Sequence, residues 1–288
     1  MINGQPFRAS YPLSGRTALV TGASRRAGIG YAVARRLAAY GASVYVHHHT
    51  PHDEEQPWGA DPEGPEGVVA GVREAAADGA TVAHGPGDLA DPETPARLVS
   101  AAREALGGRL DILVANHGLS GYDGDLGAVD AAMLDAHWAV NTRSTVLLVQ
   151  ALARQPRPPE STPPGRVVLL TSGQDVRGGM PDEIAYALAK GALSSATRTL
   201  ATALGHRRIT VNAVNPGPVD TGYLTGEDHA AVASMFDGGR WADPDDPARL
   251  ISWLTTDEAG WITGEVINSE GGFARWPRPG RTFDAPGT

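Results

Sequence analysis

The sequence predicts an α/β protein built on a doubly wound, mainly parallel sheet of seven strands, with helices on both faces. Three observations lead to this fold class. Short apolar runs alternate along the chain with segments of helical periodicity. The first run leads through a glycine-rich turn into a helix and a second strand, which is a βαβ unit. No repeat or shift of composition divides the 288 residues, so we expect a single domain over 1–288, with its core at about 15–272.

The expected strands are short apolar runs, suited to burial on both faces of a parallel sheet. They are 17–21, 43–47, 80–84, 110–115, 166–171, 209–214 and 265–268. The expected helices are 31–40, ending at Gly41 as a C-cap, 68–78, 92–106, starting at a proline, 129–153, 183–204, a weak segment at 222–236, and 244–256. The polar segments 50–67 and 156–165 are expected to be surface loops, and the tail 277–288 to be irregular.

Composition and charge exclude several classes of protein. The formal net charge is −9, whereas a nucleic-acid partner requires a basic face. The absence of cysteine excludes disulfides and thiolate metal sites. Residues 1–10 lack the apolar core of a secretory signal, and no apolar run approaches the roughly 18 residues of a membrane span. We therefore expect a soluble, cytoplasmic protein with neither nucleic-acid nor membrane partners.

The chain contains one lysine, Lys190, and it follows Tyr186 by four residues on an expected helix. Residues at this spacing share one helix face. A nearby ammonium favours a phenolate and lowers the pKa of a tyrosine, which would let the pair transfer a proton near neutral pH. The alternative is an ordinary helix on which the lysine stem packs along the surface.

A glycine-rich loop, with Gly22, Gly28 and Gly30, joins the first strand to its helix. Glycines let the backbone approach a pyrophosphate closely, and the helix N-terminus supplies N–H donors. The alternative is an ordinary tight turn between a strand and a helix.

Further turn residues follow later strands, at the sheet edge where open α/β folds bind ligands. They are Asp88, Asn116 with His117 and Gly118, Ser172 and Pro216. Asp88 is suited to accept from an adenine amino group, or else to cap the helix that begins near Pro92. The collection of these turns on one edge indicates a binding site.

The ordered set of motifs is similar to that of the short-chain dehydrogenase/reductase family, from about Gly15 to Gly272. The matching residues are Thr21, Gly22, Gly28, Ile29, Gly30, Asp88, Asn116, His117, Gly118, Asn141, Ser172, Tyr186, Lys190, Pro216, Gly217, Pro218, Thr221, Gly271 and Gly272. The resemblance implies a Rossmann-type fold and a nicotinamide cofactor.

The resemblance also implies catalytic roles. Tyr186 would be the general acid in carbonyl reduction, and the base in the reverse direction. Lys190 would hold the nicotinamide ribose hydroxyls and keep the pKa of Tyr186 low. Ser172 would orient the substrate oxygen, unless it only forms a turn. Asn141 would fix a water that relays protons through Lys190, unless it only bonds a neighbouring carbonyl. Thr221 would bind the nicotinamide carboxamide, unless it is a cap.

The implied cofactor contacts extend from the glycine loop to the turn after the sixth strand. They are Gly22, Ser24, Arg25, Arg26, Gly28, Ile29, Gly30, His48, Asp88, Leu89, Asn116, Gly118, Tyr186, Lys190, Pro216, Gly217, Val219 and Thr221.

Two spacings bear on the reaction. The Gly22-x5-Gly28-x-Gly30 loop resembles that of enoyl-thioester reductases, but those enzymes separate their tyrosine and lysine by a wider gap than Tyr186 and Lys190. The catalytic pair therefore favours an NADPH-dependent oxidoreductase that reduces a carbonyl to an alcohol, or catalyses the reverse. An enoyl-type or imine reductase is the alternative. A catalytically silent nucleotide sensor is least favoured, because such proteins typically lose the tyrosine or the lysine.

The end of the second strand bears on the choice between NADP and NAD. NAD-specific members usually carry an acid there, and this chain has the segment from His47 to Thr50. Arg25 and Arg26 in the glycine loop are suited to a 2′-phosphate, so NADP(H) is favoured. The acids that follow at 53–55 would reverse this preference if they folded back onto the ribose.

The histidines His47, His48, His49 and His52 invite a metal interpretation. Alternate residues of a strand face opposite sides, which makes ligation of one metal by the run awkward. We therefore expect no metal site.

Substrate and assembly are less constrained by the sequence. The segment 222–239 is expected to cover the substrate, a small carbonyl compound or alcohol, as an apolar lid, unless its aromatic residues belong to the core. Members of the family commonly form homotetramers through helices that correspond to 129–153 and 183–204. We expect a homo-oligomer, tetramer or dimer.

Overall fold

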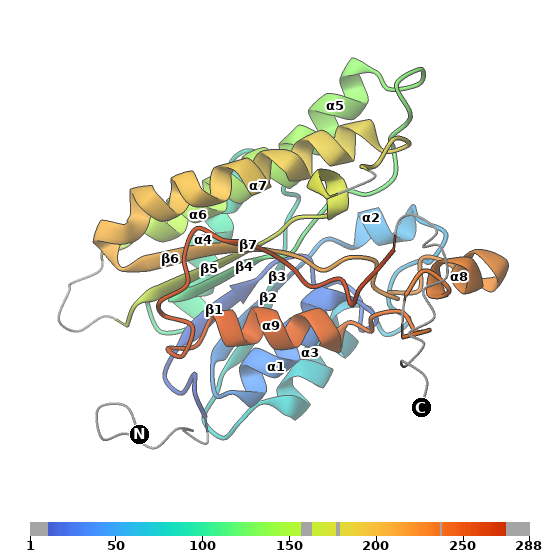
Figure 1. The fold of residues 1–288 in the computed structure, drawn as a ribbon. Coiled ribbons are helices and arrows are strands. Elements are labelled where there is room, and N and C mark those ends of the chain that lie inside the picture. Colours follow the sequence, from blue (N-terminus) through green and yellow to red (C-terminus); the bar gives the residue numbers. More distant parts are fainter. Residues whose placement is uncertain (1–10, 157–162, 177–178, 237, 275–288) are drawn as a thin grey trace, which may run out of the picture.

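The computed structural model describes residues 11–156, 163–176, 179–236 and 238–274, and one parallel sheet of seven strands organises them (Figure 1). The strand order is β3-β2-β1-β4-β5-β6-β7. All strands are parallel, but successive strands are added toward one edge from β1 to β3 and toward the other edge from β4 to β7, with the switch between β1 and β4. This order confirms the predicted doubly wound sheet. The strands are β1 Thr17–Val20, β2 Ser43–His48, β3 Val82–Pro86, β4 Ile112–Ala115, β5 Gly165–Leu170, β6 Ile209–Asn215 and β7 Val266–Asn268.

Helices cover both faces of the sheet. One layer contains α1 Ile29–Ala39, α3 Gly64–Ala75 and α9 Asp245–Leu254. The opposite layer contains α4 Thr94–Ala105, α6 Ser144–Ala153 and α7 Ile184–Leu204. Figure 1 shows the two layers below and above the sheet. Shorter helices lie outside them: α2 Thr50–Glu54, α5 Ala131–His137 and α8 Gly226–Ala233.

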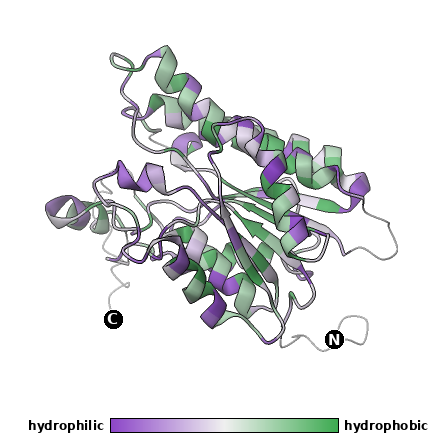
Figure 2. Ribbon diagram, turned by 180° about the vertical axis from the view of Figure 1, so that it is seen from behind, coloured by the Kyte–Doolittle hydropathy of each residue, from purple (hydrophilic) through white to green (hydrophobic). Residues whose placement is uncertain are grey.

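Alternation along each strand divides the core in two. In β1, Ala18 and Val20 pack into the cluster beneath α1, α3 and α9, whereas Leu19 packs into the cluster beneath α4, α6 and α7. In β4, Val114 and Leu113 divide in the same way. Figure 2 shows the hydrophobic colour concentrated on the sheet and the inner faces of the helices. The apolar runs of β1, β4 and β5 are continuous because both sides of these central strands are buried, whereas the edge strands β3 and β7 are only partly buried.

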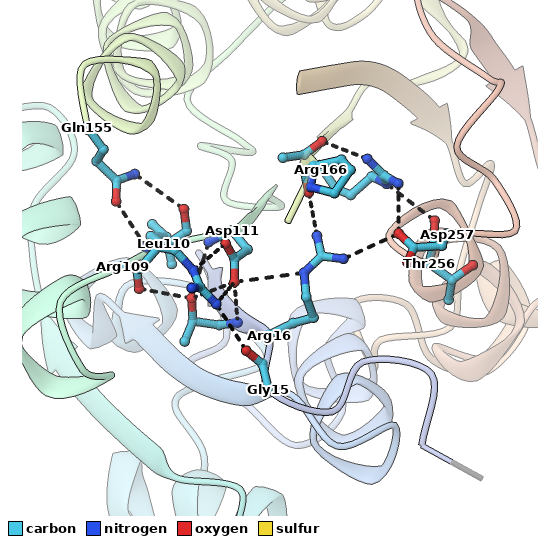
Figure 3. A network of polar contacts seen from close by, with 12 residues as sticks. Gly15, Arg16, Arg109, Leu110, Asp111, Gln155, Arg166, Thr256 and Asp257 are labelled. Atoms are coloured by element: carbon cyan, nitrogen blue, oxygen red, sulfur yellow. Dashed lines mark hydrogen bonds and ion pairs between the residues drawn. The ribbon is translucent and has the colours of Figure 1, made fainter. Parts of the chain in front are cut away.

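An ionic network closes the amino-terminal edge of the sheet, away from the glycine loop (Figure 3). The fully buried Asp111 accepts from the backbone N–H of Thr17 (3.1 Å) and from Nε of Arg109 (2.8 Å). Arg166 Nη2 donates to Asp257 at 3.0 Å. The bonds of Asp111 tie the start of β1 to the start of β4, and the bond of Arg166 ties β5 to the loop after α9.

Two expected elements differ from the prediction. The segment 50–67 is not a plain surface loop, because it forms α2 and the start of α3, whose first turns accommodate Pro51 and Pro65. The single helix expected at 129–153 is α5 and α6 joined by a π-helical segment, Trp138–Arg143. The weak segment at 222–236 contains the helix α8. Most of the expected loop 156–165 and all of the tail 277–288 lie outside the described residues. No helix in the described ranges is long and apolar enough to cross a membrane.

Candidate active site

A cleft of about 1120 Å³ opens at the carboxyl ends of the strands, where the strand order reverses. Open α/β sheets bind ligands at this switch point, because loops from the two halves diverge there. The glycine loop and the segments after β3, β4, β5 and β6 line its walls. Helices α2 and α8 lie at the same end of the sheet (Figure 1).

The glycine loop packs too closely for side chains. Gly22 has a φ of +69°, and a Cβ atom there would lie 2.5 Å from Cα of His117. A Cβ atom on Gly30 would lie 2.6 Å from Nδ2 of Asn116, which itself donates to the carbonyl of Gly22 (2.9 Å). Helix α1 begins at Ile29 without a side-chain cap, so its first N–H groups are left for an anion. The loop therefore fits a pyrophosphate.

Tyr186 and Lys190 line the cleft from one face of α7, with Lys190 Nζ 5.7 Å from the centre of the Tyr186 ring. The amine donates to the carbonyls of Leu170 (3.0 Å) and His117 (3.5 Å), and burial lowers the pKa of Lys190 to about 8. Burial, reinforced by Glu183, raises the pKa of Tyr186 to about 12. The lowering of the tyrosine pKa expected from the lysine is therefore wrong for this structure, because desolvation of the phenol outweighs it.

Ser172 follows β5 and lines the same cleft. Its hydroxyl donates to Sδ of Met180 at 3.7 Å. Burial raises the pKa of the Tyr186 phenol, and the nearby Ser172 hydroxyl acts in the opposite direction. Both hydroxyl-bearing residues thus line the same cleft, an arrangement suited to holding a single substrate oxygen.

Asn141 lies behind this wall, within the π-helical segment. Its Oδ1 accepts from the backbone N–H of Leu119 (2.7 Å), and its Nδ2 donates to the carbonyl of the same residue (3.1 Å). A Cβ atom on Gly118 would lie 3.3 Å from Lys190 Nζ and 3.4 Å from Asn141 Oδ1. Gly118 therefore lets the two side chains approach one another. Irregular π turns of this kind are frequent at functional sites.

Most of the residues expected at the site line this one cleft. They are Gly22, Ser24, Arg25, Gly28, Ile29, Asp88, Leu89, Asn116, Gly118, Ser172, Tyr186, Lys190, Pro216, Gly217, Val219 and Thr221. Four others, Asn141, Arg26, Gly30 and His48, are not among its lining residues. Asp88 does not cap the helix that follows: it accepts from the N–H of Ala90 (2.8 Å), and α4 begins without a side-chain cap.

Comparison with known proteins identifies the family. The model of the enoyl-(acyl carrier protein) reductase family matches residues 22–274. The chain is 39% identical over 260 residues to the uncharacterized oxidoreductase YjdA of Bacillus subtilis, covering 90% of this chain and 97% of YjdA. The chain belongs to the short-chain dehydrogenase/reductase family.

Other relatives of this short-chain dehydrogenase/reductase carry informative names. It is 31% identical to versicolorin reductase stcU of Emericella nidulans, over 92% of this chain and 98% of that protein. Its fold is similar to that of LugOII, a promiscuous reductase that catalyses keto-reduction at C1 during lugdunomycin biosynthesis, with a TM-score of 0.75, 33% identity and coverage of 91% and 98%. A short-chain dehydrogenase from Burkholderia cenocepacia in complex with NADP matches with a TM-score of 0.77, 33% identity and the same coverage.

Two residues of this short-chain dehydrogenase/reductase that were expected to contact the cofactor, Arg26 and His48, do not line the cleft. The guanidinium of Arg26 is bound by Asp61 (2.8 Å) and Glu63 (2.8 Å), so it is already neutralised outside the cleft. His48 is buried, with Nε2 3.3 Å from Nδ1 of His84 on β3. Alternation along β2 turns the residues on either side of His48 toward the cleft instead.

His47 supports the site in a way that the sequence motifs did not predict. Its Nδ1 accepts from the N–H of Gly22 (3.2 Å), so its Nε2 donates to the carbonyl of Gly87 (2.9 Å). Burial lowers the pKa of His47 to about 4, which keeps the imidazole neutral. It therefore braces the glycine loop against the turn after β3. The period-2 pattern of the strand was the signal for its orientation.

Arg25 was expected to favour NADP(H) unless the acids at 53–55 folded back toward it, and the structure places both in the cleft. Its Nε lies 3.2 Å from Oδ1 of Asp53, and its guanidinium lies over the ring of Trp58 (5.5 Å). Asp53 and Glu55 line the cleft with Arg25. The acids that follow the second strand thus fold back to this end of the cleft, because α2 turns the chain toward the glycine loop.

Asp123 and His137 were also missed. Asp123 accepts from the backbone N–H groups of Ala185 (2.9 Å) and Tyr186 (2.7 Å), and so caps the catalytic helix α7 from a distant loop. His137 lies 3.8 Å from Asp123, packs edge-on against the Tyr186 ring, and has Nδ1 3.2 Å from Nδ2 of Asn141. No local pattern could reveal a cap supplied from more than 60 residues away. The described residues contain no group of three or more His, Asp or Glu side chains suited to a metal ion.

Proposed function

We propose that this enzyme reduces the carbonyl group of a small molecule to an alcohol, or catalyses the reverse oxidation, with NADP(H) as its cofactor. The observation that carries the proposal is the meeting of Ser172, Tyr186 and Lys190 in a cleft that also contains the glycine cradle. The keto-reduction named for LugOII, at 33% identity, supports the same reaction class. The nicotinamide supplies the hydride when it is bound.

The side chains of this chain would divide the remaining work. The Tyr186 phenol is protonated at neutral pH, since its pKa is raised to about 12, and this is the state that a proton donor to the carbonyl oxygen needs. The Ser172 hydroxyl donates a hydrogen bond to the same oxygen and holds it within reach of the phenol. The Lys190 ammonium stabilises the phenolate left behind, and its lowered pKa of about 8 suits it to exchange a proton near neutral pH.

The preference for NADP(H) over NAD(H) rests on the end of the cleft next to α2. No carboxylate ends β2, and Arg25 lines the cleft where a 2′-phosphate would lie. The NADP complex of the Burkholderia cenocepacia relative supports this choice. Asp53 opposes it, because it shares Arg25 and would repel a phosphate. Paired titration with NADPH and NADH, followed by tryptophan fluorescence, tests the preference. Tighter binding of NADH would refute it.

An enoyl-type reduction is a second candidate, because the matching family model bears that name and the glycine-loop spacing resembles such enzymes. Assays of NADPH consumption with simple ketones, an enoyl thioester and a cyclic imine separate these reactions. Turnover of the ketone alone would support our proposal. Turnover of the enoyl thioester or the imine without the ketone would overturn it.

We also propose that the protein self-associates through the outer faces of α5 and α7. Leu134 on α5, Trp138 at the start of the adjoining π-helical segment and Leu188 on α7 are large apolar side chains that are 38%, 53% and 61% exposed. Burial of such side chains favours association. A monomeric mass in light scattering would refute this proposal.

A further inference from the structure

The carboxylate of Glu183 lines the cleft beside the expected reaction centre. Glu183 immediately precedes α7 and is exposed on the cleft wall, three residues before Tyr186. Both side chains line the same cleft, and the carboxylate is close enough to the phenol to act on it electrostatically. A small substrate in the cleft can therefore contact both groups.

No cation balances this carboxylate within the described part of the chain. Glu183 makes neither an ion pair nor a side-chain hydrogen bond there, and its neighbours in the cleft wall include the apolar Met180 and the aromatic Tyr223. The basic groups of the cleft are committed elsewhere: Arg25 to Asp53, and the amine of Lys190 to the carbonyl of Leu170.

The charge of Glu183 acts on the groups around it. Burial raises the pKa of Tyr186 and that of Tyr223, and the charge of Glu183 adds to both shifts. Burial raises the pKa of Glu183 itself, and the nearby Asp123 and Asp182 add to the shift. This part of the cleft therefore has a negative potential that the protein leaves uncompensated, and a complementary group on a ligand would be stabilised there.

We propose that Glu183 determines substrate specificity, by selecting carbonyl compounds that carry a cationic or hydrogen-bond-donating group a few ångströms from the carbonyl. An ammonium or a hydroxyl would bind the unpaired carboxylate. An anionic group at the same position, such as a carboxylate, would be repelled by it. This inference rests on the proposed carbonyl reduction.

The test uses four acetophenones that differ only at the para position: methyl, hydroxymethyl, aminomethyl and carboxylate. The values of kcat/KM with NADPH are compared for the wild type, Glu183→Gln and Asp182→Asn. Asp182 is the matched control, because it is an exposed neighbouring acid that does not line the cleft. A charge pair at about 6 Å in a partly solvated cleft changes affinity by about tenfold.

We expect the wild type and Asp182→Asn to prefer the aminomethyl or hydroxymethyl ketone over the methyl ketone, and to disfavour the carboxylate by about tenfold. In Glu183→Gln, the ratio of aminomethyl to carboxylate kcat/KM should fall by about tenfold or more. An unchanged ratio in this variant would overturn the specificity role while leaving carbonyl reduction standing. A wild type that reduces none of the four ketones, although it binds NADPH, would overturn both.

Discussion

Substitution of Asp123 tests whether the catalytic helix depends on a cap from a distant loop. The side chain of Asp123 is 4% exposed, and it accepts from the N–H groups of Gly124 (2.8 Å), Ala185 (2.9 Å) and Tyr186 (2.7 Å). Hydrogen bonds to charged groups contribute about 1.5–3 kcal/mol each, and capping residues about 1 kcal/mol. Water can satisfy part of the loss, so we expect Asp123→Ala to lower the free energy of unfolding by about 3 kcal/mol.

The effect on turnover should be larger than a general loss of stability explains. One of the three donors is the backbone of Tyr186 itself, so loss of the cap moves the phenol relative to Ser172. A displacement of about 1 Å at a reacting group can cost about 100-fold in rate. Asp123→Asn should fall between the wild type and Asp123→Ala, because one carboxamide oxygen cannot replace both Oδ1 and Oδ2.

The assay combines urea unfolding, followed by tryptophan fluorescence, with kcat for a ketone and with NADPH affinity. Asp130→Ala is the control, because Asp130 caps α5 through one bond to the N–H of Met133 (2.9 Å), away from the cleft wall. It should cost about 1 kcal/mol of stability and leave kcat unchanged. If Asp123→Ala is destabilised but keeps a kcat within twofold of the wild type, the positioning argument is wrong.

Four further outcomes are expected. Tyr186→Phe should abolish ketone turnover and leave NADPH affinity nearly intact; persistent turnover would refute its role as proton donor. Gly22→Ala should abolish cofactor binding, because the new Cβ would lie 2.5 Å from the backbone of His117, and normal fluorescence titration would contradict this. Asp111→Ala should lower the free energy of unfolding by about 3–5 kcal/mol, since it leaves buried donors and Arg109 unpaired; urea unfolding measures it, with kcat of the remaining folded enzyme unchanged. Lys190 has a pKa lowered to about 8, so the unfolded chain binds more protons above that pH; its contribution should make the protein more stable from about pH 8 to pH 10, and Lys190→Met should flatten this rise in a pH series of unfolding curves.

Short-range patterns in the sequence were sufficient to predict the strands of the sheet and the main motifs of the site. The apolar runs predicted all seven strands, because strands buried on both faces consist mainly of apolar residues, although the buried Asn212 lies at the centre of β6. The glycine loop and the Tyr186–Lys190 pair were also visible, since a close backbone approach and a shared helix face depend on short spacings alone. These motifs were enough to predict one ligand-binding edge of the sheet.

Only the tertiary structure decided what depends on contacts between distant segments. It bound Arg26 to Asp61 and Glu63, and it turned His48 toward β3 and away from the cleft. It brought Asp123 to the start of α7, and among the residues that the structure describes it left Glu183 exposed without a counter-charge. Charge pairing, capping and burial are set by the three-dimensional neighbours of a side chain, and those neighbours lie tens of residues away in the sequence.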